Sequence, residues 1–432
     1  MKKFLTLTLF LFCLAPLFAQ SAEKELDFYK NEINNADKKQ YPSIEWDLNS
    51  WLGRNYSLPS AADAMLQKAK VEYLNKKYVP AYLTLLRYAY EFPAKEPNKD
   101  FVNKVIAEFP NKQQVELMQN LTPKNLPQAT EDRLNMFFTV ANKLNLKDAN
   151  EHLLKDYDMF FARFPGYENK DKIELLLGDA YRNDGNYLAA LSKYDKVWKI
   201  YPSTKYKAAS LRMKGDIYAS ELKDYEKAKG YYNQVLADFP NSVEIPTVYK
   251  HLAMLDASTK NYDSAINNAQ KAYEGYLKNG QKLEAYNALM FKAEVQEKNV
   301  KNYNSAVETL KVAAELMPAQ EQYYVEAKQK EAQIQAKKLK DNYAERDVLE
   351  EIAARFPNGE NGVEALFRSA ELTEKFGDTA KAKEKYNKVI LNRPQSKVAV
   401  KAQKKINSLD KAAAKAKLKA EKEAQNTVET TK

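Results

Sequence analysis

The stretch DKIELLLGDAYRNDGNYLAALSKYDKVWKIYPSTK, residues 171–205, decides the fold of this chain. Its marks are two small residues twelve positions apart, an Asn-Tyr turn between them, and a proline twelve positions later: Gly178, Ala190, Asn186-Tyr187 and Pro202. A small residue in each of two antiparallel helices lets their backbones approach closely. Proline cannot continue a helical hydrogen-bond ladder. The stretch therefore predicts one helical hairpin.

The same marks recur along the chain. Prolines stand 37 to 39 residues apart, or about twice that where one is missing, at Pro93, Pro165, Pro202, Pro240, Pro318, Pro357 and Pro394. Small residues mark the second helices at Ala81, Ala190, Ala228, Ala265, Ala306 and Ala382. A fixed period of this length is typical of stacked helical hairpins. Only 11 glycines occur in 432 residues, and sheet proteins usually need more of them for their turns.

These positions resemble the signature of the tetratricopeptide repeat family. In the best unit the matching residues are Gly178, Tyr181, Tyr187, Ala190, Tyr194, Val197 and Pro202. Glu174 replaces the family's tryptophan, and Glu72, Asp256 and Thr373 stand where Tyr181 stands. The resemblance covers about residues 60–408. It implies an all-α, right-handed superhelical solenoid of about eight or nine helical hairpins.

Some helix ends, such as Phe239-Pro240-Asn241-Ser242, are similar to those of cell-envelope members of the family. Examples are the outer-membrane barrel-assembly lipoprotein and the periplasmic coordinator of the Tol–Pal system. This chain lacks the lipoprotein cysteine of the first and has more repeats than the second.

Five segments are expected. They are a signal peptide (1–19), an N-terminal helix with a tryptophan-containing cap (20–60), degenerate repeats (61–165), the regular array (166–408) and a Lys/Ala-rich tail (409–432). Lys2 and Lys3 precede an apolar run from Phe4 to Leu14 that is too short to span a bilayer, which is typical of a secretion signal. An N-terminal membrane anchor is the alternative. Cleavage is expected after Ala19, or else after Ala22.

Cysteine use and charge restrict the chemistry. Cys13 is the only cysteine and falls within the apolar run, so the processed chain would have no thiol for disulfides, metals or nucleophilic catalysis. The net charge is +10, but nine lysines against four acids lie in residues 401–432. The repeats are therefore close to neutral, and we expect no nucleic-acid partner.

The sequence contains no motif for catalysis, a cofactor or a metal. It lacks a phosphate-binding glycine loop, HExxH, GxSxG and CxxC. His152 and His251 are about a hundred residues apart and are interpreted as surface or half-buried helix residues. We therefore expect no enzyme, although a hydrolase using paired carboxylates is an alternative. The tyrosines occupy packing positions of the repeat and are expected in the core.

The family binds partners on the face made by its first helices. Mapped onto this chain, that face contains Lys172, Leu175, Asp179, Arg182, Arg212, Asp216, Lys250 and Met254. Its mixed charge suits an extended peptide or a helix, and an ordinary solvated helix face is the alternative. Trp46 and Trp51 lie outside the repeats, in an expected loop. They are interpreted as a cap over the first hairpin or as a partner contact.

The leading hypothesis is a non-enzymatic periplasmic scaffold that binds a protein partner in cell-envelope assembly or maintenance. The alternative is a protein that binds peptidoglycan or another polysaccharide, with the lysine-rich tail contacting anionic wall polymer. Export to the periplasm is expected, with the outer membrane as the candidate surface for peripheral association.

Overall fold

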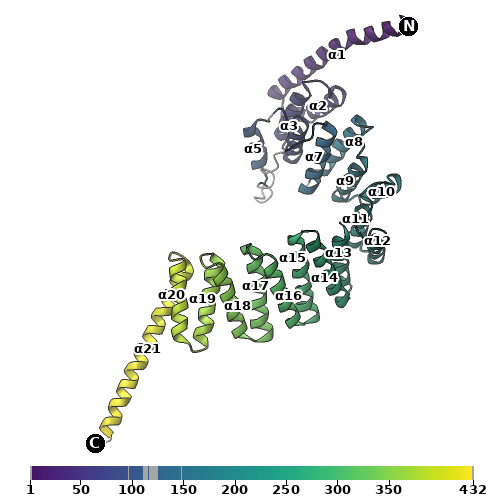
Figure 1. Cartoon of the computed structure of the whole chain (residues 1–432). Helices are drawn as coiled ribbons and strands as arrows, with labels where there is room; N and C mark the ends of the chain where they lie inside the picture. Colours follow the sequence, from purple (N-terminus) through teal and green to yellow (C-terminus); the bar gives the residue numbers. More distant parts are fainter. Residues whose placement is uncertain (1, 96, 110–114, 116–124, 147, 431–432) are drawn as a thin grey trace. The chain divides into compact units, whose positions relative to one another are not determined.

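The computed structural model describes residues 2–95, 97–109, 115, 125–146 and 148–430, with side chains from Phe18 to Glu423 within these ranges. All regular elements in the described residues are helices, which confirms the predicted all-α fold of repeated helical hairpins (Figure 1). The chain divides into two compact units, Met1–Lys223 and Asp224–Lys432. Each unit is described by itself.

Unit 1 begins with two helices that precede the repeats, followed by three hairpins and the first helix of another. The helices are α1 (Lys2–Asn35), α2 (Tyr41–Asn55), α3 (Ala61–Leu74), α4 (Tyr78–Glu91), α5 (Lys99–Ala107), α7 (Thr130–Leu144), α8 (Asn150–Arg163), α9 (Lys170–Asn183), α10 (Tyr187–Ile200) and α11 (Lys207–Ser220). A short 3₁₀ turn, Lys38–Gln40, joins α1 to α2. The α3–α4, α7–α8 and α9–α10 pairs form the hairpins.

Unit 2 contains four complete hairpins between a leading helix and a long final one. Its helices are α12 (Tyr225–Asp238), α13 (Ile245–Ser258), α14 (Tyr262–Lys278), α15 (Lys282–Glu294), α16 (Tyr303–Leu316), α17 (Glu321–Ile334), α18 (Asn342–Arg355), α19 (Glu360–Lys375), α20 (Thr379–Asn392) and α21 (Lys397–Thr430). In both units the odd-numbered helices from α7 onward are first helices of hairpins, except α21, and the even-numbered ones are second helices.

The small residues lie where the helices cross. The alanines predicted to mark the second helices are fully buried. They are Ala81 in α4, Ala190 in α10, Ala265 in α14, Ala306 in α16 and Ala382 in α20. A Cβ atom added to Gly178 would lie only 2.4 Å from Cε1 of Tyr194. The close-approach argument made from the sequence is therefore confirmed at this crossing.

Two first helices of unit 2 end in a π-helical turn. Val295–Val300 follows α15, and Gln335–Leu339 follows α17. In the first case the small residues Ala293 and Ala306 are thirteen positions apart rather than twelve. A π turn accommodates one extra residue per helix, so it keeps both small residues at the crossing.

The N-terminal segment differs from the expected loop. Tyr41–Asn55 forms helix α2, whose buried residues Ile44, Leu48 and Trp51 lie on one face. Pro42 is tolerated because it lies in the first turn, where its missing N–H is not needed. α1 continues through the predicted signal segment, but the side chains of residues 1–17 lie outside the described part, so the signal peptide stays a prediction.

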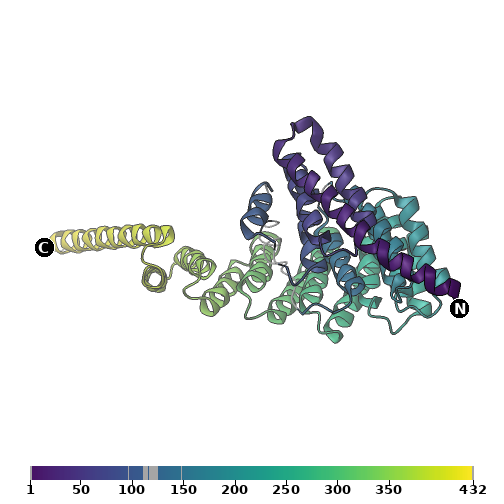
Figure 2. The same ribbon diagram turned by 90° about the horizontal axis from the view of Figure 1, so that it is seen from above.

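The Lys/Ala-rich tail belongs to one long helix, α21, which begins at Lys397. α21 packs its first turns against α20 through Ala399, Ala402 and Ile406. Every residue from Asp410 to Glu423 is exposed. Figures 1 and 2 both show the C-terminal part of α21 continuing past the end of α20.

Candidate functional site

The predicted first-helix residues lie on three helices. Lys172, Asp179 and Arg182 are on α9 and Arg212 and Asp216 on α11, all in unit 1, whereas Lys250 and Met254 are on α13 in unit 2. The site is therefore built here from the residues of unit 1. Lys250 is half-buried and Met254 is 53% exposed, and their part in a site stays a prediction.

Four of these residues form one cluster across α9 and α11, here called the α9–α11 cluster: Asp179, Arg182, Arg212 and Asp216. Arg212 makes an ion pair with Asp216, one helical turn away, and their side chains are 14% and 6% exposed. Tyr194 Oη donates a hydrogen bond to Asp179 Oδ1 at 2.6 Å. Burial raises the pKa of Asp179, while the nearby Arg212 and Arg182 oppose that shift. The cluster is thus a largely fixed set of alternating charges.

Arg182 and Lys172 are the cations at the border of this cluster. Arg182 lies 3.4 Å from Glu221, and both side chains are more than a quarter exposed. Lys172 is half-buried, and burial, helped by nearby Lys205, lowers its pKa. An incoming carboxylate could reach the Arg182 guanidinium and compete with Glu221 for it.

The two tryptophans have different environments on α2. Trp51 is fully buried, and its indole Nε1–H donates to the backbone oxygen of Ala22 at 2.8 Å. Trp46 is 70% exposed. Trp51 therefore belongs to the packing between α1 and α2, and only Trp46 is placed where a partner could contact it.

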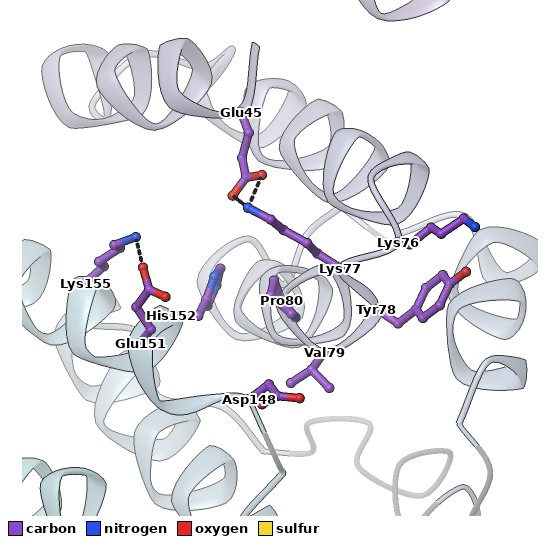
Figure 3. Close-up of a pocket in the computed structure, with 10 residues that line it drawn as sticks. All are labelled: Glu45, Lys76, Lys77, Tyr78, Val79, Pro80, Asp148, Glu151, His152 and Lys155. Atoms are coloured by element: carbon purple, nitrogen blue, oxygen red, sulfur yellow. Dashed lines mark hydrogen bonds and ion pairs between the residues drawn. The ribbon is translucent and has the colours of Figure 1, made fainter. Parts of the chain in front are cut away.

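Unit 1 also has a cavity of about 400 Å³, lined by residues other than those of the α9–α11 cluster (Figure 3). It is bounded by α2, by the turn between α3 and α4, and by the start of α8. Two ion pairs lie among its lining residues: Lys77 with Glu45 of α2 at 2.8 Å, and Lys155 with Glu151, one turn apart on α8, at 2.8 Å. His152 lines the cavity and lies between the two pairs in Figure 3.

Behind His152 lies a group of buried charges on α3, α4 and α8, here called the buried charge cluster. Its members are Lys68, Glu72, Thr84, Arg87, Glu91, His152, Asp156 and Arg163. Lys68 Nζ lies 2.9 Å from Glu72, Arg163 lies 2.8 Å from Glu91, and Arg87 forms an ion pair with Asp156. The cations and carboxylates are therefore matched inside the unit.

The ionisation of this cluster follows from burial. Burial raises the pKa of Glu91 to about 7, although Arg163 and Arg133 favour its charged form. Burial, together with Lys68 and Arg87, lowers the pKa of His152 to about 3 despite Asp156. At neutral pH His152 is therefore a neutral imidazole, which can exchange hydrogen bonds with a bound molecule.

The sequence interpretation missed the partners of His152. Its ring nitrogens lie 3.6 Å from Glu72, on α3, and 3.7 Å from Asp156, one turn further along α8. One signal was available, because Glu72 occupies the place of Tyr181 in the repeat. Among the described residues, no three or more His, Cys, Asp or Glu side chains are arranged to hold a metal ion.

None of the helices whose side chains the structure describes is both long and apolar enough to cross a membrane. The predicted signal segment lies outside this finding.

The comparison with family models identifies the repeats. The tetratricopeptide repeat model matches residues 174–204, 207–242 and 364–396. These segments include the unit from which the sequence argument started, so the resemblance to this family is confirmed. The match does not test the likeness to the cell-envelope members. No curated protein matches the sequence.

The chain is similar at a low level to several solved structures. The C-terminal part of a TPR repeat-containing protein from Cytophaga hutchinsonii is 16% identical, covering 62% of this chain and 98% of that one, with a TM-score of 0.41. A tetratricopeptide repeat protein from Parabacteroides merdae is 14% identical, covering 68% and 99%, with a TM-score of 0.33. PilF of Pseudomonas aeruginosa is 18% identical, covering 55% and 97%, with a TM-score of 0.33. All three scores are below 0.5, so the assignment depends on the repeat match.

Proposed function

We propose that this tetratricopeptide repeat chain is a non-enzymatic scaffold of the cell envelope that binds a protein partner through the first helices of unit 1. Tetratricopeptide arrays are protein-interaction folds whose stacked repeats form extended binding surfaces. The observation that carries the proposal is the α9–α11 cluster. It brings four of the predicted residues together from two first helices that are neighbours in the array.

The cluster is suited to a segment of mixed charge. Arg212 and Asp216 form an ion pair, and Asp179 accepts a hydrogen bond from Tyr194. These side chains are already restrained, so binding costs little additional conformational entropy. Arg182 is more exposed and can exchange Glu221 for a carboxylate of the partner. Arginine contacts that become desolvated are common binding hot spots. We therefore assign an acidic position to the partner segment next to Arg182.

Export to the periplasm is part of the proposal. It is supported by Lys2 and Lys3, by the apolar run from Phe4 to Leu14, and by the small residue at Ala19. Association with the outer membrane remains a proposal of the same kind.

The test is a crosslinking pull-down from an envelope extract with the processed chain. Arg182→Ala should reduce the capture of a stoichiometric partner several-fold, because it removes the exposed cation without disturbing the Arg212–Asp216 pair. Lys199→Ala is the matched control, since Lys199 is an exposed cation on the second helix α10. Circular dichroism should be the same for both variants.

Equal capture by the two variants would reject the α9–α11 cluster as the binding site. Trp46→Ala would then be the next variant, because Trp46 is the exposed member of the tryptophan pair. Reversal of Arg212 to Glu is unsuitable, because it would place two carboxylates together in a half-buried site.

The alternative function is binding of anionic wall polymer through the tail. The observation that favours it is the full exposure of α21 after Asp410, where Lys411, Lys415, Lys417, Lys419 and Lys422 have no core to pack against. If a chain ending at Asp410 loses its retention on purified wall material while Arg182→Ala keeps it, this function is supported.

A further inference from the structure

Three turns of unit 2 place lysine in a backbone conformation that favours glycine. Lys260, Lys301 and Lys340 each join a first helix to a second helix, with φ of 65°, 59° and 60°. This left-handed region is strained for residues with a Cβ atom. Gly185 and Gly377 occupy the same place in other hairpins, with φ of 78° and 89°. The backbone of these turns therefore accepts glycine, but three successive hairpins carry lysine.

Five lysines at or next to these turns form no ion pair within the residues that the structure describes. Lys337 and Lys375 lie in the last turns before the connections, and with the three left-handed lysines they define the basic edge: Lys260, Lys301, Lys337, Lys340 and Lys375. All five side chains are exposed, whereas Lys298 and Lys381 of the same turns are paired with Glu294 and Asp378. Strain kept at a recurring position with an unused charge suggests that the charge has a function.

The carboxylates of the same turns are mostly engaged. Asp341 accepts a hydrogen bond from the backbone N–H of Ala344 at 2.9 Å, and Asp378 accepts one from Lys381 at 3.1 Å. Glu294 lies 2.5 Å from Lys298. Asp341 and Asp378 keep their negative charge in these hydrogen bonds, and Asp263 and Glu297 add to it. The excess of lysine is therefore largest at the turn after α17, where Lys337, Lys338 and Lys340 lie beside Asp341.

These turns all lie at one edge of unit 2. Successive helices from α13 to α20 run antiparallel and side by side, so the connections from first to second helices share one edge and the return connections share the other (Figure 1). Apolar groups are exposed at the basic edge as well, with Val300 at 40% and Tyr343 at 58%. The Tyr343 ring stacks on Phe376 with centroids 4.0 Å apart.

We propose that the basic edge of unit 2 docks on an anionic phospholipid surface. Lysines near such a surface attract it individually, and apolar side chains between them can enter the headgroup region. A sugar polymer fits less well, because the exposed aromatic ring is already stacked on Phe376 and has the Arg346 guanidinium 5.5 Å from its centroid. The edge lies in unit 2 and shares no residue with the α9–α11 cluster of unit 1.

The test is cosedimentation of the chain from Gln20 to Lys432 with phosphatidylglycerol-containing vesicles and with pure phosphatidylcholine vesicles. We expect binding only to the anionic vesicles, with a steep loss as salt rises. Replacing two lysines of the edge, Lys301→Gly with Lys340→Gly, should weaken binding by about fivefold per lysine. The matched control removes two lysines from the opposite edge, Lys278→Gln with Lys282→Gln, and should bind as the unchanged chain does.

Glycine is chosen because it relieves the left-handed strain, so weaker binding by this variant cannot come from unfolding if its urea midpoint is kept or raised. If the midpoint falls, Lys301→Asn with Lys340→Asn gives a second neutral pair, since asparagine also tolerates this conformation. Equal losses at both edges would overturn the proposal, because they would reflect net charge alone. Binding to a soluble anionic glycan, with no binding to anionic vesicles, would overturn it too.

Discussion

At Gly178 the close crossing of two helices leaves no room for a side chain. A Cβ atom there would lie 2.4 Å from the Tyr194 ring, and Tyr194 is itself buried and hydrogen-bonded to Asp179. Because the ring cannot move freely, we predict that Gly178→Ala destabilises unit 1 by about 1–3 kcal/mol, as overpacking does. Urea unfolding of the chain would measure it.

The matched variant is Gly53→Ala. Gly53 lies in helix α2 with no other atom within 4 Å of an added Cβ. Alanine should therefore stabilise the helix by up to about 1 kcal/mol. A Gly178→Ala midpoint at or above that of Gly53→Ala would mean that the crossing is looser than the structure shows.

Glu91 makes a second prediction, concerning pH. Its pKa rises from 4.5 to about 7 on folding, so the folded state binds this proton more tightly than the unfolded state does. Its contribution to stability is therefore complete below pH 4.5 and is lost as pH rises towards 7. The total is on the order of 3 kcal/mol.

His152 acts in the opposite direction, because its pKa falls from 6.5 to about 3, and it favours folding as pH rises. The measurement is therefore a difference: urea stability of the unchanged chain minus that of Glu91→Gln, across pH 4 to 7.5. This difference should fall with rising pH. A flat difference would show that Arg87 and Arg163 keep Glu91 ionised throughout.

Residues that depart from the repeat signature turn out to be buried polar contacts. Glu72 and Asp256, at the place of Tyr181, are almost fully buried. Thr84 donates to Glu72 at 2.7 Å and Asn268 donates to Asp256 at 2.8 Å, each from twelve positions later. A repeat frame predicts the position of such residues. It cannot predict their partners, because these depend on which polar side chain the opposite helix offers.

At the scale of elements, the period of the prolines and the positions of the small residues predicted the hairpins. Both features act through steric effects, because proline ends a helix and a small residue lets two helices approach. The loop expected around Trp46 and Trp51 was wrong although Ile44, Leu48 and Trp51 have helical spacing. That segment lies outside the repeat period, so no neighbouring unit supplied a frame for it. The π turns after α15 and α17 were also beyond prediction, since the extra residue could equally have lengthened the connection.

The contact between α1 and α2 makes a prediction about the processed N-terminus. Ala22 is buried, and its oxygen accepts the Trp51 indole N–H, whereas Gln20 and Ser21 are exposed. A cut after Ala19 keeps this bond, and a cut after Ala22 leaves a buried donor unpaired, which costs about 1–3 kcal/mol. We therefore predict that the exported chain begins at Gln20 and that a chain starting at Glu23 unfolds at lower urea.

Trp51→Phe tests the cause within a double-mutant cycle. It removes the indole N–H, so it should shrink the stability difference between the chains starting at Gln20 and Glu23. If the difference is as large with phenylalanine as with tryptophan, the hydrogen bond is not its origin. Mass determination of the exported protein checks the processing site separately.

At the scale of the whole molecule, each repeat is stabilised mainly by its neighbours, so the ends of an array need special packing. At the C-terminal end, the first turns of α21 supply this packing. Ala399, Ala402 and Ile406 are buried against the last hairpin, whereas the residues after Asp410 bury almost nothing. The Lys383–Asp410 ion pair marks the last contact, and both partners are partly or largely exposed.

Two truncations separate these parts of α21. A chain ending at Asp410 should melt at the same temperature as the full chain, because an exposed helix gains too little from burial to offset its ordering entropy. A chain ending at Ser396 should melt clearly lower, since it uncovers Val363, Tyr386 and Val389 in the last hairpin. Differential scanning calorimetry of unit 2 in the full chain would follow both. A large drop already at Asp410 would mean that the lysine-rich helix packs on the repeats, and its lysines would then be poor candidates for binding wall polymer.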